Sequence, residues 1–412
     1  MKRFAVVVDP YADARGFSEA FQARDCETVA VLSSPEPLEC FADRWSPELF
    51  FAAHFFDGDF QALLATLRSY DPACIIPGNE FAVELAAMLA DALLPGSGNS
   101  PRSALAHRDK GRMALALERA GLPHLRTVSS SDPEAVALWI ERAGLTGKPM
   151  VLKPPKSAGA EDVYLVPPGG DWMPYFDRIL GKVNKFGFRN ETVIVQEYAE
   201  GTEYIVDLYS VGGRHGLVDV CRYVKHQRDD RIGIYDAAVF MPPADPDVLA
   251  AAAYVCRAAD AVGIRNGSTH AEVMLTADGP RLIEIAGRLA GAGMMASALL
   301  ATGDNQSHRT IRHVLDGCFT PGYDLRQQVR VIWLGTQAAG ILRNIEVMEA
   351  ALELPSVHSM SVMPNGQFVA PTVDVYTELG WIIQAHPDEK IVEIDYQRIK
   401  EMERQVIVVA PE

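Results

Sequence analysis

Short apolar runs and amphipathic stretches alternate along about the first hundred residues of the chain. The runs predict strands and the amphipathic stretches predict helices: strands over Phe4–Val8, Thr28–Leu32 and Ala73–Pro77, and helices over Phe17–Ala23 and Phe81–Ala92. Strands that alternate with helices form βαβ units, whose strands pair in parallel. The pattern therefore predicts a parallel-sheet domain at the N-terminus.

Beyond this domain the pattern becomes richer in strands. A helix around Met113 ends at Gly121-Leu122-Pro123, the expected Gly-then-Pro helix end. The following elements are strands over Met150–Lys153, Val163–Val166, Val193–Gln196, Glu203–Ser210, Leu217–Val224, Ala271–Leu275, Leu282–Ile285, Val329–Trp333 and Met360–Met363, and a helix over Asp247–Val262. We interpret the whole as an α/β protein of several domains, which suits its length of 412 residues.

Composition and charge exclude several classes of protein. The formal net charge of -16 argues against a nucleic-acid partner, because neutralising phosphates requires clustered Lys and Arg. The six cysteines are scattered, which indicates reduced thiols and no zinc site. The chain shows no signal-peptide pattern and no apolar run long enough for a membrane span. We therefore expect a cytoplasmic protein.

Two glutamates are the first candidates for chemistry. Glu272 and Glu284 lie on predicted strands joined by the turn Thr276–Pro280, so antiparallel pairing makes them neighbours. Adjacent carboxylates suit a magnesium ion whose coordination is completed by ATP phosphates. The alternative is two solvated glutamates on a surface hairpin. The glycine-rich segment Gly287–Gly293 follows at once and contains Arg288, which could clamp a phosphoryl group or an oxyanion there.

Two further segments suit a nucleotide. Lys153 ends an apolar strand and precedes a small-residue loop with Ser157 and Gly159, which suits nucleotide phosphates, although the P-loop spacing is absent. The segment Gln196–Glu203 interrupts a strand and offers backbone groups for adenine and a carboxylate for ribose. Taken alone, the segment is better explained as an exposed acidic turn.

The order of these pieces resembles the ATP-grasp superfamily: Asp109-Lys110, Leu152-Lys153-Pro154, the small-residue loop, Gln196-Glu197-Tyr198 with Gly201-x-Glu203, His270-x-Glu272 and Glu284-x-x-x-Arg288. Within it, the run from Glu284 to Gly291 is similar to the L-amino-acid ligases, the dipeptide-forming branch that includes bacilysin-synthetase-like enzymes. Many other branches carry an asparagine at the position of Ala286, where it helps to hold a second magnesium ion. Because Ala286 lacks this ligand atom, the sequence leaves open whether one or two magnesium ions bind.

The resemblance implies a residue assignment. The ATP contacts are expected to be Lys110, Lys153, Ser157, Gly159, Gln196, Glu197, Ala199 and Glu203, the magnesium ligands Glu272 and Glu284 (with Mn²⁺ as an alternative metal), the catalytic residue Arg288, and the substrate contacts Asp236, Arg288 and Gly291. It also implies a domain order: an N-terminal Rossmann-like domain (1–105), a linker helix and β-rich lid (106–195), a nucleotide- and metal-binding core with a large antiparallel sheet (196–320), and a C-terminal subdomain (321–412).

The predicted function is ligation of two amino acids, or of an amino acid and an amine, through an acyl phosphate. Small molecules are then the partners, without nucleic acid or membrane, and a homodimer is left open. Three alternatives remain: another ATP-grasp chemistry such as a carboxylase or purine-pathway ligase, a non-catalytic nucleotide-binding protein, and a nicotinamide enzyme. The last is disfavoured because the loop Asp9–Gly16 lacks GxGxxG. The substrates stay unidentified.

Overall fold

A four-stranded parallel sheet forms the N-terminal part of the computed structural model, which describes residues 2–410. Its order is β3 (Ala52–Phe55), β2 (Cys26–Leu32), β1 (Arg3–Val8) and β4 (Pro72–Pro77). Helix α1 (Gly16–Gln22) packs on one face, and α2 (Phe60–Arg68) and α3 (Ala82–Leu93) pack on the other. Both faces are covered, which explains why β1 is a continuous apolar run rather than an alternating one.

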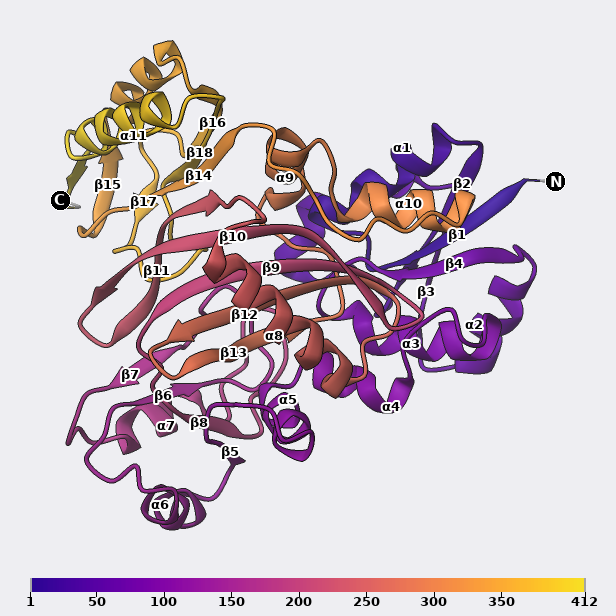
Figure 1. Ribbon diagram of the computed structural model, residues 1–412, viewed down its shortest axis with the longest axis horizontal. Coiled ribbons are helices and arrows are strands. Elements are labelled where there is room, and N and C mark those ends of the chain that lie inside the picture. Colours follow the sequence, from indigo (N-terminus) through magenta and orange to yellow (C-terminus); the bar gives the residue numbers. More distant parts are fainter. Residues whose placement is uncertain (1, 411–412) are drawn as a thin grey trace.

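An eight-stranded antiparallel sheet forms the centre of the molecule (Figure 1). Its order is β13 (Gly279–Ala286), β12 (Gly267–Thr276), β9 (Thr202–Val211), β10 (Arg214–Arg228), β11 (Arg231–Phe240), β14 (Gln328–Leu334), β18 (Gly380–His386) and β16 (Val357–Val362). Helix α8 (Pro246–Val262) packs on one face. Helices α9 (Met294–Thr302) and α10 (Gln306–Asp316) share the core on the other face with the N-terminal sheet.

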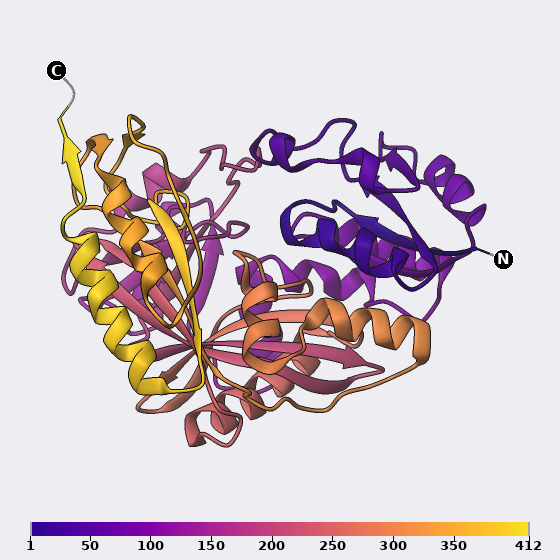
Figure 2. The ribbon, with the colours of Figure 1, turned by 90° about the horizontal axis from the view of Figure 1, so that it is seen from above.

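Two smaller units complete the fold. The first is an antiparallel sheet of β5 (Thr127–Ser130), β8 (Val193–Glu197), β6 (Met150–Lys153) and β7 (Tyr164–Val166), with helices α6 (Pro133–Arg142) and α7 (Met173–Ile179); we call it the lid. Short helix α4 (Pro101–Ala104) and helix α5 (Lys110–Arg119) lead into it. The second is the C-terminal part, with β15 (Gly340–Arg343), β17 (Phe368–Val369), β19 (Ile407–Val409) and helix α11 (Glu389–Glu403). Figure 2 shows it across a gap from the N-terminal sheet.

The mixed α/β class and the large antiparallel sheet confirm the predicted fold class. Strand β11 was not predicted: the run from Ile232 to Asp236 had been read as a loop. Gly233 and Asp236 lower its intrinsic strand preference, but β10 and β14 pair with it on both sides and supply its hydrogen bonds. No helix within residues 2–410 is both long enough and apolar enough to cross a bilayer.

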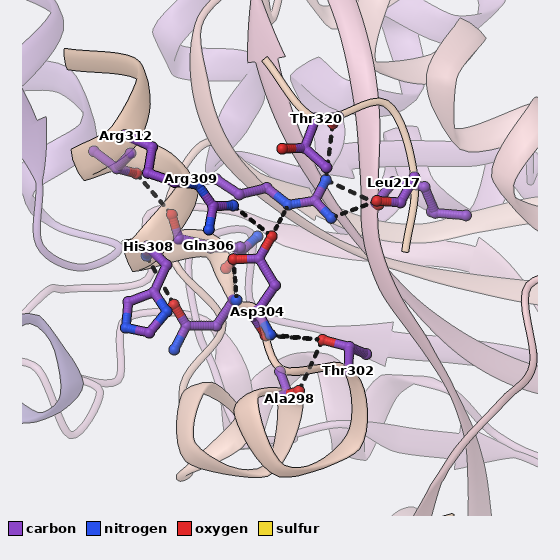
Figure 3. Close-up of polar contacts among 12 residues, drawn as sticks. Leu217, Ala298, Thr302, Asp304, Gln306, His308, Arg309, Arg312 and Thr320 are labelled. Atoms are coloured by element: carbon purple, nitrogen blue, oxygen red, sulfur yellow. Dashed lines mark hydrogen bonds and ion pairs between the residues drawn. The ribbon is translucent and has the colours of Figure 1, made fainter. Parts of the chain in front are cut away.

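A buried arginine joins helix α10 to the chain segments around it (Figure 3). The side chain of Arg309 is only 3% exposed. Its Nε donates to Asp304 (2.9 Å), and its terminal nitrogens donate to the carbonyls of Leu217 (2.9 Å), Thr320 (3.0 Å) and Gly322 (2.8 Å). One side chain thus binds three carbonyls, one on β10 and two in the segment after α10.

We predict that Arg309→Met lowers the free energy of unfolding by about 3–5 kcal/mol, because it leaves buried carbonyls and part of the Asp304 carboxylate unpaired. Urea denaturation measures the change. The matched control is Arg24→Met, which breaks an exposed pair with Asp316 (2.9 Å) and should change stability by less than about 1 kcal/mol. Equal losses in the two variants would contradict this prediction.

Candidate active site

A single large cleft of about 1760 Å³ lies between the N-terminal sheet, the lid, the eight-stranded sheet and the C-terminal part. It is lined by every predicted site residue except Asp236: Lys110, Lys153, Ser157, Gly159, Gln196, Glu197, Ala199, Glu203, Glu272, Glu284, Arg288 and Gly291. These residues span almost two hundred positions of sequence. The folded chain brings them to one place.

The two predicted metal ligands lie opposite each other. Glu272 of β12 and Glu284 of β13 are register partners, which confirms the predicted hairpin. Burial, with the neighbouring charges of Glu203 and Glu284, raises the pKa of Glu272. Burial also acts on Glu284, but Lys110 and Arg288 outweigh it and lower the pKa of that carboxyl. The described residues hold no cluster of three or more ligand side chains. Two adjacent buried carboxylates are a partial ligand set for Mg²⁺, which waters or phosphate oxygens would complete.

Two buried lysines face these carboxylates. Lys110, the first residue of α5, donates from Nζ to the Ser157 carbonyl (2.9 Å) and lies 3.2 Å from Glu284 Oε1. Lys153 ends β6 and is 3% exposed. Burial, with repulsion from Lys110, lowers the pKa of Lys153 to about 8. A buried ammonium held next to another cation is suited to an anionic ligand such as a phosphate.

The small-residue loop of the lid touches the C-terminal part. Gly159 has φ of +65°, and a Cβ at this position would clash with Val375 and lie 2.8 Å from the Tyr376 ring. Beside it, Lys185 of the lid pairs with Asp374 (3.1 Å). Glycine is therefore required here both by the backbone angle and by the close approach. The lid therefore contacts the C-terminal part across the cleft.

The predicted adenine and ribose contacts lie along the strand end of β8 and the start of β9. The Gln196 amide donates to Thr127 (2.9 Å) and the Glu197 carboxylate accepts from Arg126 Nε (2.6 Å), so both side chains are engaged within the lid. The Ala199 N–H donates to no backbone carbonyl of residues 2–410. Glu203 pairs with Lys225 through Oε2 (2.7 Å), while its buried Oε1 has no partner in the described chain. Of the residues assigned to adenine and ribose, Ala199 and Glu203 thus keep a free group, whereas the Gln196 and Glu197 side chains do not.

Arg288 has a partner that the sequence analysis missed. Its Nε donates to Glu80 Oε2 (2.9 Å), and its NH1 donates to the Leu289 carbonyl (2.7 Å). Glu80 follows strand β4 in the run Gly78-Asn79-Glu80, at the carboxyl end of a parallel sheet. That position is where α/β sheets commonly place functional side chains, and it is the signal that could have identified Glu80.

His270 and Gln306 also support the site and were not predicted. His270 Nδ1 lies 2.8 Å from Asp207 Oδ1, and the imidazole lines the cleft. Gln306 accepts from the Ala290 N–H (2.8 Å) and donates to the carbonyls of Leu208 (3.2 Å) and Thr269 (2.7 Å). It thereby ties the Gly287–Gly293 segment to strands β9 and β12, next to the network in Figure 3. These bonds fix the position of the loop that carries Arg288 relative to the large sheet.

Asp236 does not lie with the other predicted residues. It is buried on the opposite side of β11, where Lys400 Nζ lies 2.6 Å from Oδ1 and the Tyr396 hydroxyl donates to Oδ2. Its neighbour Tyr235 lines the cleft instead. Successive side chains of a strand point to opposite faces, so reading this segment as a loop led to the wrong residue. The predicted role of Asp236 as a substrate contact is therefore wrong, and its bonds to Tyr396 and Lys400 anchor helix α11 instead.

Comparison with known proteins gives consistent matches. A family profile described as an ATP-grasp domain matches residues 146–296. Dapdiamide A synthase of Enterobacter agglomerans is 31% identical over 291 residues, 70% of this chain and 68% of that protein. Carnosine synthase 1 of Mus musculus is 32% identical over 155 residues, 35% of this chain and 18% of that protein. The structure of an L-amino acid ligase from Bacillus licheniformis superposes with a TM-score of 0.75 and 16% identity, covering 100% of this chain and 99% of that one.

We predict that Lys153→Met weakens ATP binding at least about tenfold, because it removes a charge-assisted contact from a buried site. Titration calorimetry with ATP and Mg²⁺ measures the dissociation constant. The matched control is Lys148→Met, an exposed lysine just before the same strand, which should bind ATP normally. The Lys153 variant should be at least as stable as the parent, since burial disfavours the charged form of this side chain. Similar affinities in both variants would refute the assignment.

Proposed function

Given that the chain belongs to the ATP-grasp family and is an ATP-dependent ligase that forms C–N bonds, we propose that it joins the carboxylate of one amino acid to the amine of a second amino acid or of another amine. The convergence of Glu272, Glu284, Lys153 and Arg288 in one enclosed cleft is the observation that carries this proposal. The dapdiamide synthase relative and the match to an L-amino acid ligase support amino-acid ligation over carboxylation.

In the first step a carboxylate oxygen of one substrate attacks the γ-phosphorus of ATP, and ADP leaves. Phosphoryl transfer depends on positioning and on stabilisation of charge rather than on covalent help from the protein. Lys110 and Lys153 supply positive charge from buried positions at the phosphate end of the cleft. The Ala199 N–H and the free Glu203 Oε1 would orient the adenine and the ribose.

In the second step the amine nitrogen attacks the acyl carbon, phosphate leaves, and the nitrogen loses a proton. Arg288 is placed to stabilise the oxyanion of the tetrahedral intermediate, and its bond to Glu80 fixes the guanidinium plane. Closure of the lid would exclude water, which would otherwise hydrolyse the acyl phosphate. No nucleophilic side chain is needed.

The carboxylate pair fits a magnesium ion. Glu272 and Glu284 would hold it, and the ion would offset negative charge on the phosphates. Ala286 provides no ligand atom at the position where many relatives carry asparagine, so these two side chains are the protein ligands that we propose.

We predict that a matrix of amino-acid pairs with ATP and Mg²⁺ contains at least one pair that releases phosphate and forms the corresponding amide in equal amounts. Phosphate assay and mass spectrometry measure the two products together. With the carboxylate substrate alone, hydroxylamine should trap the acyl phosphate as a hydroxamate. Phosphate release that is independent of the pair, or that depends on bicarbonate instead, would exclude this function.

We predict that Glu284→Gln and Arg288→Ala each lower kcat/KM by roughly 10²–10³-fold or more, because each removes charge stabilisation that acts in the transition state. The control is Asp278→Asn, in the exposed turn of the same hairpin, which should keep normal turnover. Thermal unfolding verifies that all three variants fold. Near-normal turnover in either site variant would show that the site is wrongly assigned.

A further inference from the structure

A carboxyl of the C-terminal part faces the cleft without a partner. Glu378 lies in the segment that leads into β18 and lines the cleft. Its Oε1 is buried and has no hydrogen-bond partner among the residues that the structure describes. The cation beside this segment, Lys185, pairs with Asp374 instead (3.1 Å). Glu378 is therefore a half-buried acid, and its buried Oε1 needs a partner that the described residues do not supply.

The surroundings of Glu378 are aromatic and apolar. The cleft is also lined by Tyr235 of β11, Trp333 of β14 and Trp381 of β18. The Tyr235 and Trp333 rings lie 5.8 Å apart between centroids, and Trp333 is the register partner of Trp381, three residues after Glu378. Leu299 of α9 adds an apolar side chain. Burial, with the nearby charge of Asp374, raises the pKa of Glu378 to about 9. The carboxyl is thus held in a setting that favours its neutral form until a cation arrives.

Two other carboxylates of the cleft already pair with lysines. Glu203 pairs with Lys225 (2.7 Å), and Glu284 pairs with Lys110 (3.2 Å). Burial raises the pKa of Tyr235, and the charges of Glu272 and Glu378 both add to that shift. Tyr235 therefore lies within electrostatic range of both the proposed metal site and Glu378.

We propose that Glu378, with the faces of Tyr235 and Trp333, binds an ammonium group of one of the two substrates. A carboxylate combined with aromatic faces is the chemistry that recognises a desolvated ammonium, through an ion pair and cation–π attraction. This inference rests on the proposed ligase function and deepens it, because it makes at least one substrate cationic at the end away from the reacting carboxylate. Glu378 lies outside residues 146–296, the part of the chain that matches the ATP-grasp domain.

Binding of a simple probe tests the subsite without turnover. With ADP and Mg²⁺ present, n-butylammonium should bind the parent protein more tightly than n-butanol, and Glu378→Gln should reduce that preference at least about tenfold. Saturation-transfer NMR measures both ligands. Glu401→Gln, an exposed glutamate on helix α11, is the matched control and should keep the preference. An unchanged preference in Glu378→Gln, or no preference in the parent, overturns the proposal.

Turnover identifies which ammonium is bound. In the amino-acid pair that proves active, each amino group other than the attacking amine is removed in turn, so that every analogue can still form the amide. Glu378→Gln should raise KM at least about tenfold for the substrate with that ammonium and leave KM for its desamino analogue unchanged. An equal rise in KM for the substrate and for its desamino analogue overturns the proposal. If no pair yields an amide, the ligase function has failed, and the binding result still decides the subsite.

Discussion

The pairing of β12 with β13 places two buried carboxylates opposite each other, and the rest of the site is arranged around that negative charge. Like charges in a buried position repel unless cations compensate them. The compensation comes from distant parts of the chain: Lys110 from the start of α5, Lys153 from the lid, and Arg288 from the segment after β13. The charge balance of the hairpin therefore links the position of the lid to the position of the N-terminal sheet, because Arg288 is in turn held by Glu80.

The segments that carry the site residues are themselves held in place by further buried contacts. Gln306 holds the segment that carries Arg288 to two strands of the large sheet, and Arg309, one turn further along α10, holds the helix itself. The lid is held at its tip by Gly159 against Val375. Catalysis by positioning requires that buried contacts hold the site residues rigidly, because small displacements strongly weaken charge stabilisation.

Much of the fold and most of the site could be predicted from the sequence, and the failures have physical causes. The glutamate hairpin, the lysine at the end of β6 and the glycine loop follow from local patterns, so their residues were found. Asp236 was misassigned because β11 is formed by pairing on both sides, which overrides the weak local preference of a segment with Gly233 in it. Glu80 and Glu378 were missed because each reaches the cleft from a part of the chain far from the recognised motifs. The position of Glu80 at the end of β4 was a signal, whereas no local pattern indicates Glu378.

The division of the cleft between two regions of the chain has an evolutionary consequence. The groups that activate the carboxylate lie on the lid and on strands β9, β12 and β13, whereas the aromatic wall at the other end comes largely from β11, β14 and β18. Substitutions on β14 and β18 can therefore change the wall of the cleft without touching the residues that we propose for phosphoryl transfer. In such a lineage, changes confined to the last quarter of the gene would alter the substrate while the proposed chemistry is kept.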